Sequence, residues 1–327
     1  MSQNTQIYSR KRVRLEDGKR LELPGLKIAN TKYIGKGVTS LVYQGDLLDD
    51  ATGKVIRRVV MKELYPDPQK EGEEIYVGRR ADGTLSVGKT PDYEMKKKVF
   101  LAGYYRQMEL AVSNAMEVAV SPFGKGLYES GDGLYIVSEA HMGSSVDKVD
   151  FETLDDKLEV IARICGALKI LHHNGYVLLD FKPENFLWIN ESEPHLVKIL
   201  DLDSVIHIGV REKDDEQIFV AEKDEVLNSN NRYCTYAMRV LRNTLEKSPW
   251  LYRDKKKTVV VPQENIFNTG LMMFEYLFEK HPDLWLDICE PDAEQKLRKR
   301  YGIDKKMSGD MIRIIQKALK LDKIRLR

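Results

Sequence analysis

The sequence has few cysteines, no long apolar run and almost no net charge, and each of these features excludes a class of protein. Its three cysteines, Cys165, Cys234 and Cys289, are far apart and form no CxxC pair, which argues against a disulfide scaffold or a cysteine-based zinc site. Lys and Arg total 52 and Asp and Glu 51, giving a net charge of +1, so nothing indicates binding to nucleic acid or to an anionic membrane. No stretch approaches the roughly 18 apolar residues of a membrane-spanning helix.

The composition is that of a soluble globular protein with more than one domain. Charged residues make up 31% and apolar residues 42% of the chain, a balance that distinguishes it from a disordered segment. At about 100–200 residues per domain, a chain of 327 residues favours two. The polar start of the chain has no apolar core of a secretory signal, so we expect a cytoplasmic protein.

The first 140 residues are rich in strand patterns. Alternating apolar residues in 13–15 and 20–23 flank the turn signal Asp17-Gly18, which predicts a hairpin that ends at Pro24-Gly25. Further along, the pattern predicts strands over 27–34, 57–64 and 133–138, a hairpin inserted within 65–91, and a helix over 93–114.

The rest of the chain is predominantly helical in pattern. Apolar residues recur at steps of three and four along 151–174, which ends before Gly175, and this spacing is typical of one face of a helix. Similar patterns predict helices over 265–278 and 309–321. A strand-rich part followed by a helix-rich part favours an α+β protein of two lobes with a boundary near residue 140.

Two features of the first part have chemical potential but are weak alone. Gly35 and Gly37 lie between two strand patterns, where glycines let backbone N–H groups approach phosphates closely. A Gly-x-Gly in this setting is more often only a tight turn. Lys62 ends a β-branched strand, yet most lysines are solvated surface charges.

A stronger signal follows the helix that ends before Gly175. Asp180, Lys182 and Asn185 lie close together, and Asp201 follows a second strand pattern. This order suggests a general base with a magnesium site, because Mg²⁺ prefers the hard oxygens of Asp and Asn side chains together with substrate phosphates. The alternative is an ordinary turn at Pro183 and Asn185 near a helix end.

Together, these patterns resemble the eukaryotic-like (Hanks-type) serine/threonine protein kinases, and the resemblance spans roughly residues 29–325. The first part of the chain contributes four matching segments. Gly35-x-Gly37-x-x-Ser40-x-Val42 is similar to the glycine-rich loop, with serine in place of the third glycine. Residues 59–62 resemble the VAIK strand, and residues 134–139 the strand that enters the hinge. Lys62-Glu63-Leu64-Tyr65-Pro66 and the long 65–91 insertion resemble a bacterial branch of the family.

In the second part, the resemblance has four departures. Asp180-x-Lys182-Pro183-Glu184-Asn185 matches the catalytic loop HRDxKPEN, but Leu178-Leu179 replaces His-Arg. Asp201-Leu202-Asp203 occupies the place of the DFG motif, with leucine and aspartate at its second and third positions. Asn265 occupies the position where helix F usually has aspartate. The motif APE has no clear counterpart, and residues 248–250 and 236–241 are both weak candidates.

The resemblance implies a role for each matching residue. Lys62 would hold the α- and β-phosphates and pair with Glu109, for which Glu117 is the alternative. Asp180 would orient the substrate hydroxyl and accept its proton, and Lys182 would stabilise the γ-phosphate. Asn185 and Asp201 would bind Mg²⁺, with Mn²⁺ as a second option. The other residues expected to contact the nucleotide are Gly35, Gly37, Val42, Val60, Ser138, Glu139 and Leu187.

The resulting prediction is a bilobal α+β protein-kinase fold. It has an N-terminal hairpin extension over 1–28, a small β-rich lobe over 29–139 with the inserted hairpin at 65–91, and a larger helical lobe over 140–327. The expected partners are ATP and a protein substrate, without nucleic acid or membrane insertion, and the sequence does not indicate an oligomeric state. Two other functions remain open: a pseudokinase scaffold that binds nucleotide without turnover, and a small-molecule kinase or AMP transferase.

Overall fold

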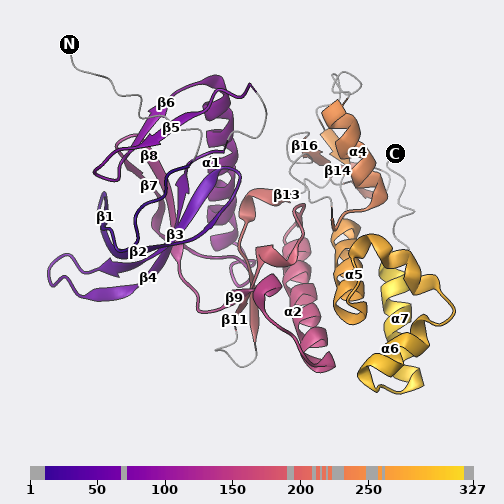
Figure 1. Cartoon of the computed structure of the whole chain (residues 1–327). Helices are drawn as coiled ribbons and strands as arrows, with labels where there is room; N and C mark the ends of the chain where they lie inside the picture. Colours follow the sequence, from indigo (N-terminus) through magenta and orange to yellow (C-terminus); the bar gives the residue numbers. More distant parts are fainter. Residues whose placement is uncertain are drawn as a thin grey trace, which may run out of the picture. The chain divides into compact units, whose positions relative to one another are not determined.

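The chain folds into two compact units, Met1–His141 and Met142–Arg327, and is a mixed α+β protein. The computed structural model describes residues 12–67, 72–189, 195–207, 211–213, 216–218, 220–222, 232–247, 257–259 and 262–319. The first unit has most of the β-structure, and the second is mainly helical (Figure 1).

The first unit is built on one antiparallel sheet of six strands in the order β1-β2-β3-β4-β8-β7. Its strands are β1 (Leu21–Leu23), β2 (Leu26–Lys36), β3 (Ser40–Leu48), β4 (Val55–Leu64), β7 (Pro122–Ser130) and β8 (Gly133–Glu139). The predicted strands over 27–34, 57–64 and 133–138 are therefore confirmed as β2, β4 and β8.

The predicted N-terminal hairpin is wrong in its pairing. The turn at Asp17-Gly18 exists, but its flanks do not pair with each other, because Gly18 N–H donates to Thr31 O of β2 at 2.7 Å. The hairpin forms instead across Pro24-Gly25, where β1 pairs with β2. Since β1 belongs to the six-stranded sheet, residues 21–28 are part of the first unit's main sheet and not of a separate extension.

The inserted hairpin and the predicted helix are both confirmed. Strands β5 (Tyr76–Arg79) and β6 (Leu85–Gly88) pair around a turn that contains Asp82-Gly83. Helix α1 (Pro91–Ala111) follows directly. Its first turn is capped by Thr90, whose hydroxyl accepts a hydrogen bond from Tyr93 N–H at 3.2 Å, a typical device for starting a helix.

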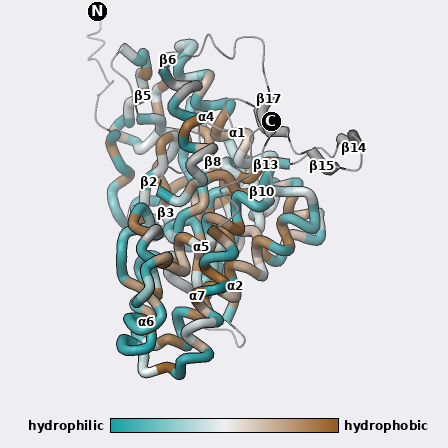
Figure 2. Tube along the Cα trace, turned by 90° about the vertical axis from the view of Figure 1, so that its right-hand side faces the viewer, coloured by the Kyte–Doolittle hydropathy of each residue, from teal (hydrophilic) through white to brown (hydrophobic). Residues whose placement is uncertain are grey.

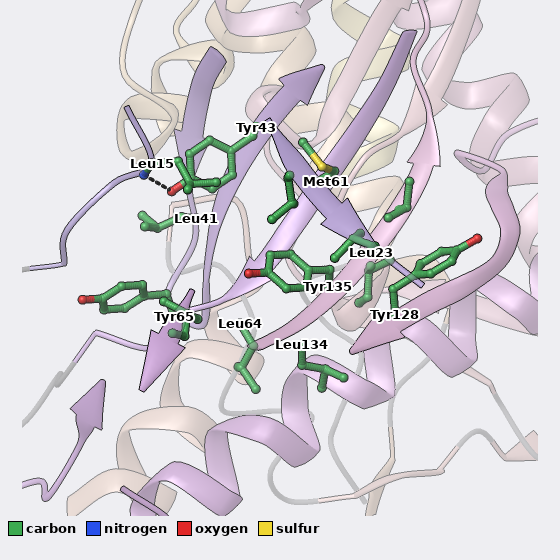
Figure 3. Close-up of a cluster of buried hydrophobic side chains, with 14 of the residues drawn as sticks. Leu15, Leu23, Leu41, Tyr43, Met61, Leu64, Tyr65, Tyr128, Leu134 and Tyr135 are labelled. Atoms are coloured by element: carbon green, nitrogen blue, oxygen red, sulfur yellow. Dashed lines mark hydrogen bonds between the residues drawn. The ribbon is translucent and has the colours of Figure 1, made fainter. Parts of the chain in front are cut away.

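The core of the first unit is unusually rich in tyrosine. Tyr43, Tyr65 and Tyr135 are each about 1% exposed and pack among Leu41, Met61 and similar apolar side chains (Figure 3). The hydroxyls of these tyrosines find partners inside the core, as buried polar groups require. This tyrosine-lined core fixes the position of the strands and of the residues that precede β1.

The second unit consists of helices with small sheets of two or three short strands between them. Its helices are α2 (Leu154–His173), α4 (Tyr236–Lys247), α5 (Gln263–Phe278), α6 (Ala293–Tyr301) and α7 (Lys305–Leu319). Its short 3₁₀ segments are η1 (Val146–Lys148), η2 (Pro183–Asn185), η3 (Leu202–Ser204) and η5 (Pro282–Cys289). Its strands are β9 (Ser144–Ser145), β10 (Tyr176–Leu178), β11 (Phe186–Ile189), β12 (Leu196–Ile199), β13 (Val205–His207), β14 (Arg211–Lys213), β15 (Glu216–Ile218), β16 (Val220–Glu222) and β17 (Lys257–Val259).

The three helices predicted in this unit are confirmed as α2, α5 and α7. Helix α2 begins with a capping box, in which the Thr153 hydroxyl accepts from Asp156 N–H and the Asp156 carboxylate accepts from Thr153 N–H. Helix α5 is buried on nearly all sides, and apolar positions recur along it (Figure 2). Among the helices of the described residues, none has the length and apolar character needed to cross a membrane.

Candidate active site

The glycine-rich segment forms the turn between β2 and β3. Strand β2 ends at Lys36 and β3 begins at Ser40, and Gly37 N–H donates to Ser40 O at 2.9 Å to close the turn. The predicted order of strand, glycine turn and strand is therefore present, with Val38 half-exposed at the tip.

The predicted nucleotide residues of the sheet lie together on one face. Gly35 pairs with Val42, Val42 with Lys62, and Lys62 with Ile136, so these residues form one row across four strands. In a neighbouring row, Val60 pairs with Ser138. Because directly paired residues project to the same side of a sheet, the glycine segment, the lysine and the pair Val60–Ser138 share a surface.

Gly35, near the end of β2, and Gly37, in the turn, are not required by the fold. A Cβ atom at Gly35 would have no atom within 4 Å, and one at Gly37 would meet only the Ser40 hydroxyl at 3.4 Å. Gly45 of β3 differs, because its Cβ would come within 2.5 Å of Ile28 Cγ2. Gly45 is thus needed for packing, whereas Gly35 and Gly37 leave open space over the turn, which fits a segment that a ligand approaches closely.

The residue after Lys62 has a structural role that the sequence analysis missed. Glu63 is fully buried on the opposite face of β4, and its carboxylate pairs with the Arg79 guanidinium of β5. Tyr135 O–H donates to Glu63 Oε1 at 3.0 Å, and Tyr43 O–H donates to Oε2 at 3.3 Å. The signal was available, because the alternation Val59, Met61, Glu63 already assigns the glutamate to the buried face.

The partner of Lys62 on the helix stays a prediction. Glu109 lies near the end of α1, where its carboxylate pairs with Arg106 at 2.5 Å and its side chain is 53% exposed. Glu117, the alternative, follows the helix in the turns of residues 112–118. The inward face of α1 instead presents a buried amide, that of Gln107.

Gln107 is the second residue that the sequence analysis missed, and it contacts a predicted one. Its amide nitrogen donates to Ser138 Oγ at 2.7 Å and to Val120 O at 2.8 Å. Gln107 and Ser138 are both buried. The side chain of Glu139, next along β8, pairs with Arg57 at 2.7 Å. The backbone N–H of Glu139 donates to Ser121 O at 3.0 Å, so both its carboxylate and its N–H have partners within the first unit.

In the second unit, the predicted base and its neighbours form one hydrogen-bonded cluster between β10 and β11. Lys182 Nζ lies 2.5 Å from Asp180 Oδ2. Asn185 Nδ2 donates to the same oxygen at 3.1 Å and to Asp180 O at 2.8 Å. The 3₁₀ turn η2, which begins at Pro183, brings the asparagine back over the aspartate.

The charges around Lys182 place Asp201 in the same neighbourhood. Burial alone would lower the pKa of the Lys182 ammonium, but the carboxylates of Asp180 and Asp201 outweigh burial and raise it above its usual value. Asp201 lies at the end of β12, immediately before η3. Asp180, Lys182 and Asp201 therefore form a local group of charges, with the neutral amide of Asn185 next to Asp180.

The donor set of this cluster fits a magnesium ion. The Asn185 amide nitrogen donates to Asp180. The amide oxygen of Asn185 therefore points away from Asp180. That oxygen and the Asp201 carboxylate are the hard ligands that Mg²⁺ prefers, with few protein ligands where substrate phosphates supply the rest. No group of three or more His, Cys, Asp or Glu side chains suited to a metal exists among the residues that the structure describes.

The departures from the catalytic-loop pattern have a visible basis. Leu179, where the pattern has arginine, is 4% exposed, and its N–H donates to Ser204 O at 2.9 Å. Asn265 of α5 accepts from Leu178 N–H at 3.1 Å and donates to Leu178 O at 2.6 Å. The strand that precedes Asp180 is thus anchored to α5 through both of its peptide groups at Leu178.

The remaining predicted positions are only partly within the described residues. Leu187 is half-buried on β11, where it pairs with Lys198 and Ser145. Of the two candidates for the APE motif, residues 236–241 fall in α4, and residues 248–250 lie outside the described residues.

Comparison with known proteins indicates a likeness to kinases. No family model matches the chain. Serine/threonine-protein kinase 16 of Homo sapiens is 25% identical over 138 residues, which are 42% of this chain and 39% of that protein. Calcium-dependent protein kinase 22 of Arabidopsis thaliana is 32% identical over 92 residues, or 26% of this chain and 18% of that protein. Ribosomal protein S6 kinase 2 alpha of Gallus gallus is 33% identical over 82 residues, or 24% of this chain and 11% of that protein.

These matches are partial. The chain spans less than half the length of each of these relatives. All three relatives are eukaryotic, so the bacterial branch suggested by the inserted hairpin stays a prediction. Over part of its length, the chain is similar to serine/threonine protein kinases.

Proposed function

We propose that the chain is an ATP- and Mg²⁺-dependent serine/threonine protein kinase of the Hanks type with a bilobal fold. The observation that carries this proposal is the cluster of Asp180, Lys182 and Asn185, together with the charge of Asp201 close to Lys182. The partial similarity to serine/threonine protein kinases supports the same interpretation. So does the row of Gly35, Val42 and Lys62 on one face of the sheet.

The proposed chemistry uses each group of the cluster. Asp180 accepts the proton of a substrate serine or threonine as its hydroxyl oxygen attacks the γ-phosphorus. Lys182 brings positive charge to the transferred phosphoryl group, and Lys62 holds the α- and β-phosphates. When bound by Asn185 and Asp201, Mg²⁺ would supply neutralisation of the phosphate charge.

The pseudokinase is the second candidate, and a specific observation favours it. The DFG motif reads Asp201-Leu202-Asp203, and Leu178-Leu179 replaces the His-Arg of the catalytic loop. The presence of Lys62, Asp180, Asn185 and Asp201 together argues for turnover. A small-molecule kinase or an AMP transferase has less support, because Lys182-Pro183-Glu184 is typical of protein kinases.

Phosphotransfer to a generic protein substrate tests the proposal. We expect Lys62→Met and Asp201→Ala each to reduce the rate by roughly a hundredfold or more, the usual cost of removing a group that stabilises transition-state charge. Asp155→Ala is the matched control, since this exposed aspartate lies in the first turn of α2. It should leave the rate unchanged. A wild type that binds MgATP but transfers nothing would instead establish the pseudokinase.

A further inference from the structure

The residues before β1 are held firmly by the core of the first unit. Val13 N–H donates to the Tyr65 hydroxyl at 3.2 Å. Leu15 N–H donates to the Tyr43 hydroxyl at 3.1 Å (Figure 3). Arg79 Nε donates to Val13 O at 2.9 Å. The Leu15 side chain is 5% exposed. Buried groups of the core therefore help to set the position of residues 12–15.

Arg12, the first residue of this anchored segment, reaches the glycine turn. Its Nη1 donates to Gly37 O at 2.7 Å, to Ser40 O at 3.0 Å and to Tyr65 O at 3.2 Å. Its Nη2 pairs with Asp67 at 3.0 Å. The Arg12 side chain is only 8% exposed, and its hydrogen bonds are charge-assisted because the guanidinium is a cation.

The two turn carbonyls that Arg12 binds belong to the first and last residues of the turn. The same residues are joined by the bond from Gly37 N–H to Ser40 O. The two middle residues of the turn are held by the segment that follows β4. Tyr65 N–H donates to Thr39 O and Asp67 N–H donates to Val38 O, each at 3.0 Å. The guanidinium ties both ends of the turn to the segment that already holds its middle.

We propose that Arg12 is a positioning residue that fixes the glycine-rich turn for nucleotide binding, an inference that rests on the proposed function. A glycine-bearing turn has many accessible backbone conformations, and holding it in one of them costs conformational entropy. If Arg12 holds the turn before the ligand arrives, binding no longer carries that cost. The segment before β1 thus acts on the nucleotide through the turn, without touching it.

Lysine cannot replace this arginine. A guanidinium presents several donors in a fixed plane, and Arg12 uses them on three carbonyls and one carboxylate. A lysine ammonium is a compact point charge on a flexible stem, with fewer donors and no fixed plane. Arg12→Lys should therefore keep the charge and lose most of the positioning.

The test compares Arg12→Ala and Arg12→Lys with Arg14→Ala. Arg14 is two residues away and exposed, with its guanidinium 3.7 Å from the centre of the Tyr33 ring. Because Arg14 is also an arginine, Arg14→Ala changes the net charge by the same amount as Arg12→Ala. The measurements are the Kd for MgATP by calorimetry, the melting temperature without nucleotide, and the hydrogen exchange of the amides of residues 36–40. Both Arg12 variants should bind MgATP roughly tenfold more weakly, the effect of losing about one charge-assisted bond. Their turn amides should exchange faster.

The outcomes separate this inference from the proposed function. A wild type that does not bind MgATP would overturn the proposed function. If wild type binds MgATP and the Kd values of Arg12→Lys and Arg14→Ala both lie within twofold of the wild-type Kd, the role of Arg12 is overturned. The proposed function would then still stand. A purely structural role would lower the melting temperature of the Arg12 variants and leave their Kd unchanged, which also contradicts the inference. Should Arg12→Ala not fold, Arg12→Lys and Asp67→Asn give the same comparison, with a smaller loss expected for Asp67→Asn because the three carbonyl bonds remain.

Discussion

Glu63 and Arg79 form a buried ion pair inside a core that is otherwise apolar and aromatic. Burial would lower the pKa of the Arg79 guanidinium, but the hydrogen bonds and charge of Glu63 outweigh it and raise the pKa above its usual value. Burial, with the adjacent Glu63 charge, also raises the pKa of the Tyr135 hydroxyl, so this group remains a donor at all physiological pH values. Each member of the network thus depends on the others for its hydrogen bonds.

Removing one member of the pair should be far more costly than removing an exposed arginine. Arg79→Met leaves a charged carboxylate with no exposed surface and no cation, and we expect a loss of about 3–5 kcal/mol in the free energy of unfolding. The measurement is urea denaturation followed by circular dichroism. The double variant Glu63→Gln/Arg79→Met should recover much of the loss, because it buries no unpaired charge.

Arg80→Met is the matched control for this prediction. Arg80 pairs with Asp132 at 3.5 Å, and both side chains are about 40% exposed, so its loss should cost about 1 kcal/mol or less. Equal destabilisation by Arg79→Met and Arg80→Met would contradict the role given to the buried pair.

Asn265 shows why an amide replaces the carboxylate that the kinase pattern has at this position. It is completely buried, and its oxygen accepts from Leu178 N–H while its nitrogen donates to Leu178 O. A carboxylate could provide the acceptor but not the donor. The sequence showed the substitution, but its reason required knowing that both peptide groups at Leu178 face α5.

At the scale of elements, α1 and β8 are joined by the bond between Gln107 and Ser138. The sequence shows that Ser138 is small, which alone suggests open space behind it. The structure places the Gln107 amide there, bonded to the serine hydroxyl at 2.7 Å. The small side chain therefore makes room for a glutamine of the helix.

This contact leads to a prediction about nucleotide analogues. If Ser138 borders the adenine, as the proposed function implies, wild type should use an N6-benzyl ATP poorly because Gln107 occupies the space. Gln107→Ala should improve the use of that analogue relative to ATP by roughly tenfold, the scale on which apolar pockets discriminate by size. The ratio of kcat/KM values for the two nucleotides measures this. A wild type that uses both nucleotides equally well would show that Gln107 does not limit the pocket.

The hairpins illustrate what a local pattern can and cannot predict. Asp82-Gly83 lies in the turn of the hairpin predicted within 65–91, and among the described residues its strands β5 and β6 pair only with each other. Asp17-Gly18 carries the same signal, but there β2 is available, and Thr31 takes up the hydrogen bonds of Gly18 and Lys19. A turn dipeptide thus predicts a turn, whereas strand pairing depends on the whole sheet.

At the scale of the whole molecule, the order of strand-rich and helix-rich parts was predictable from the sequence. Apolar periodicity over long segments identified β2, β4, β8, α2, α5 and α7, since periodicity reports which face is buried. The cluster at Asp180 was predictable because its members are close in sequence. The contacts of Glu63, Gln107 and Arg12 were not, because each joins segments that are far apart along the chain.

Phosphoryl transfer by the whole chain is the central claim, and labelled ATP tests it most directly. Wild type and Asp180→Ala are incubated with Mg²⁺, a mixture of protein substrates and ATP labelled at either the α- or the γ-phosphorus, followed by phosphoamino-acid analysis. The account predicts γ-label on serine or threonine with wild type, no α-label, and loss of the γ-label with Asp180→Ala. Incorporation of α-label would instead indicate AMP transfer, and γ-label that persists with Asp180→Ala would contradict the role of this aspartate.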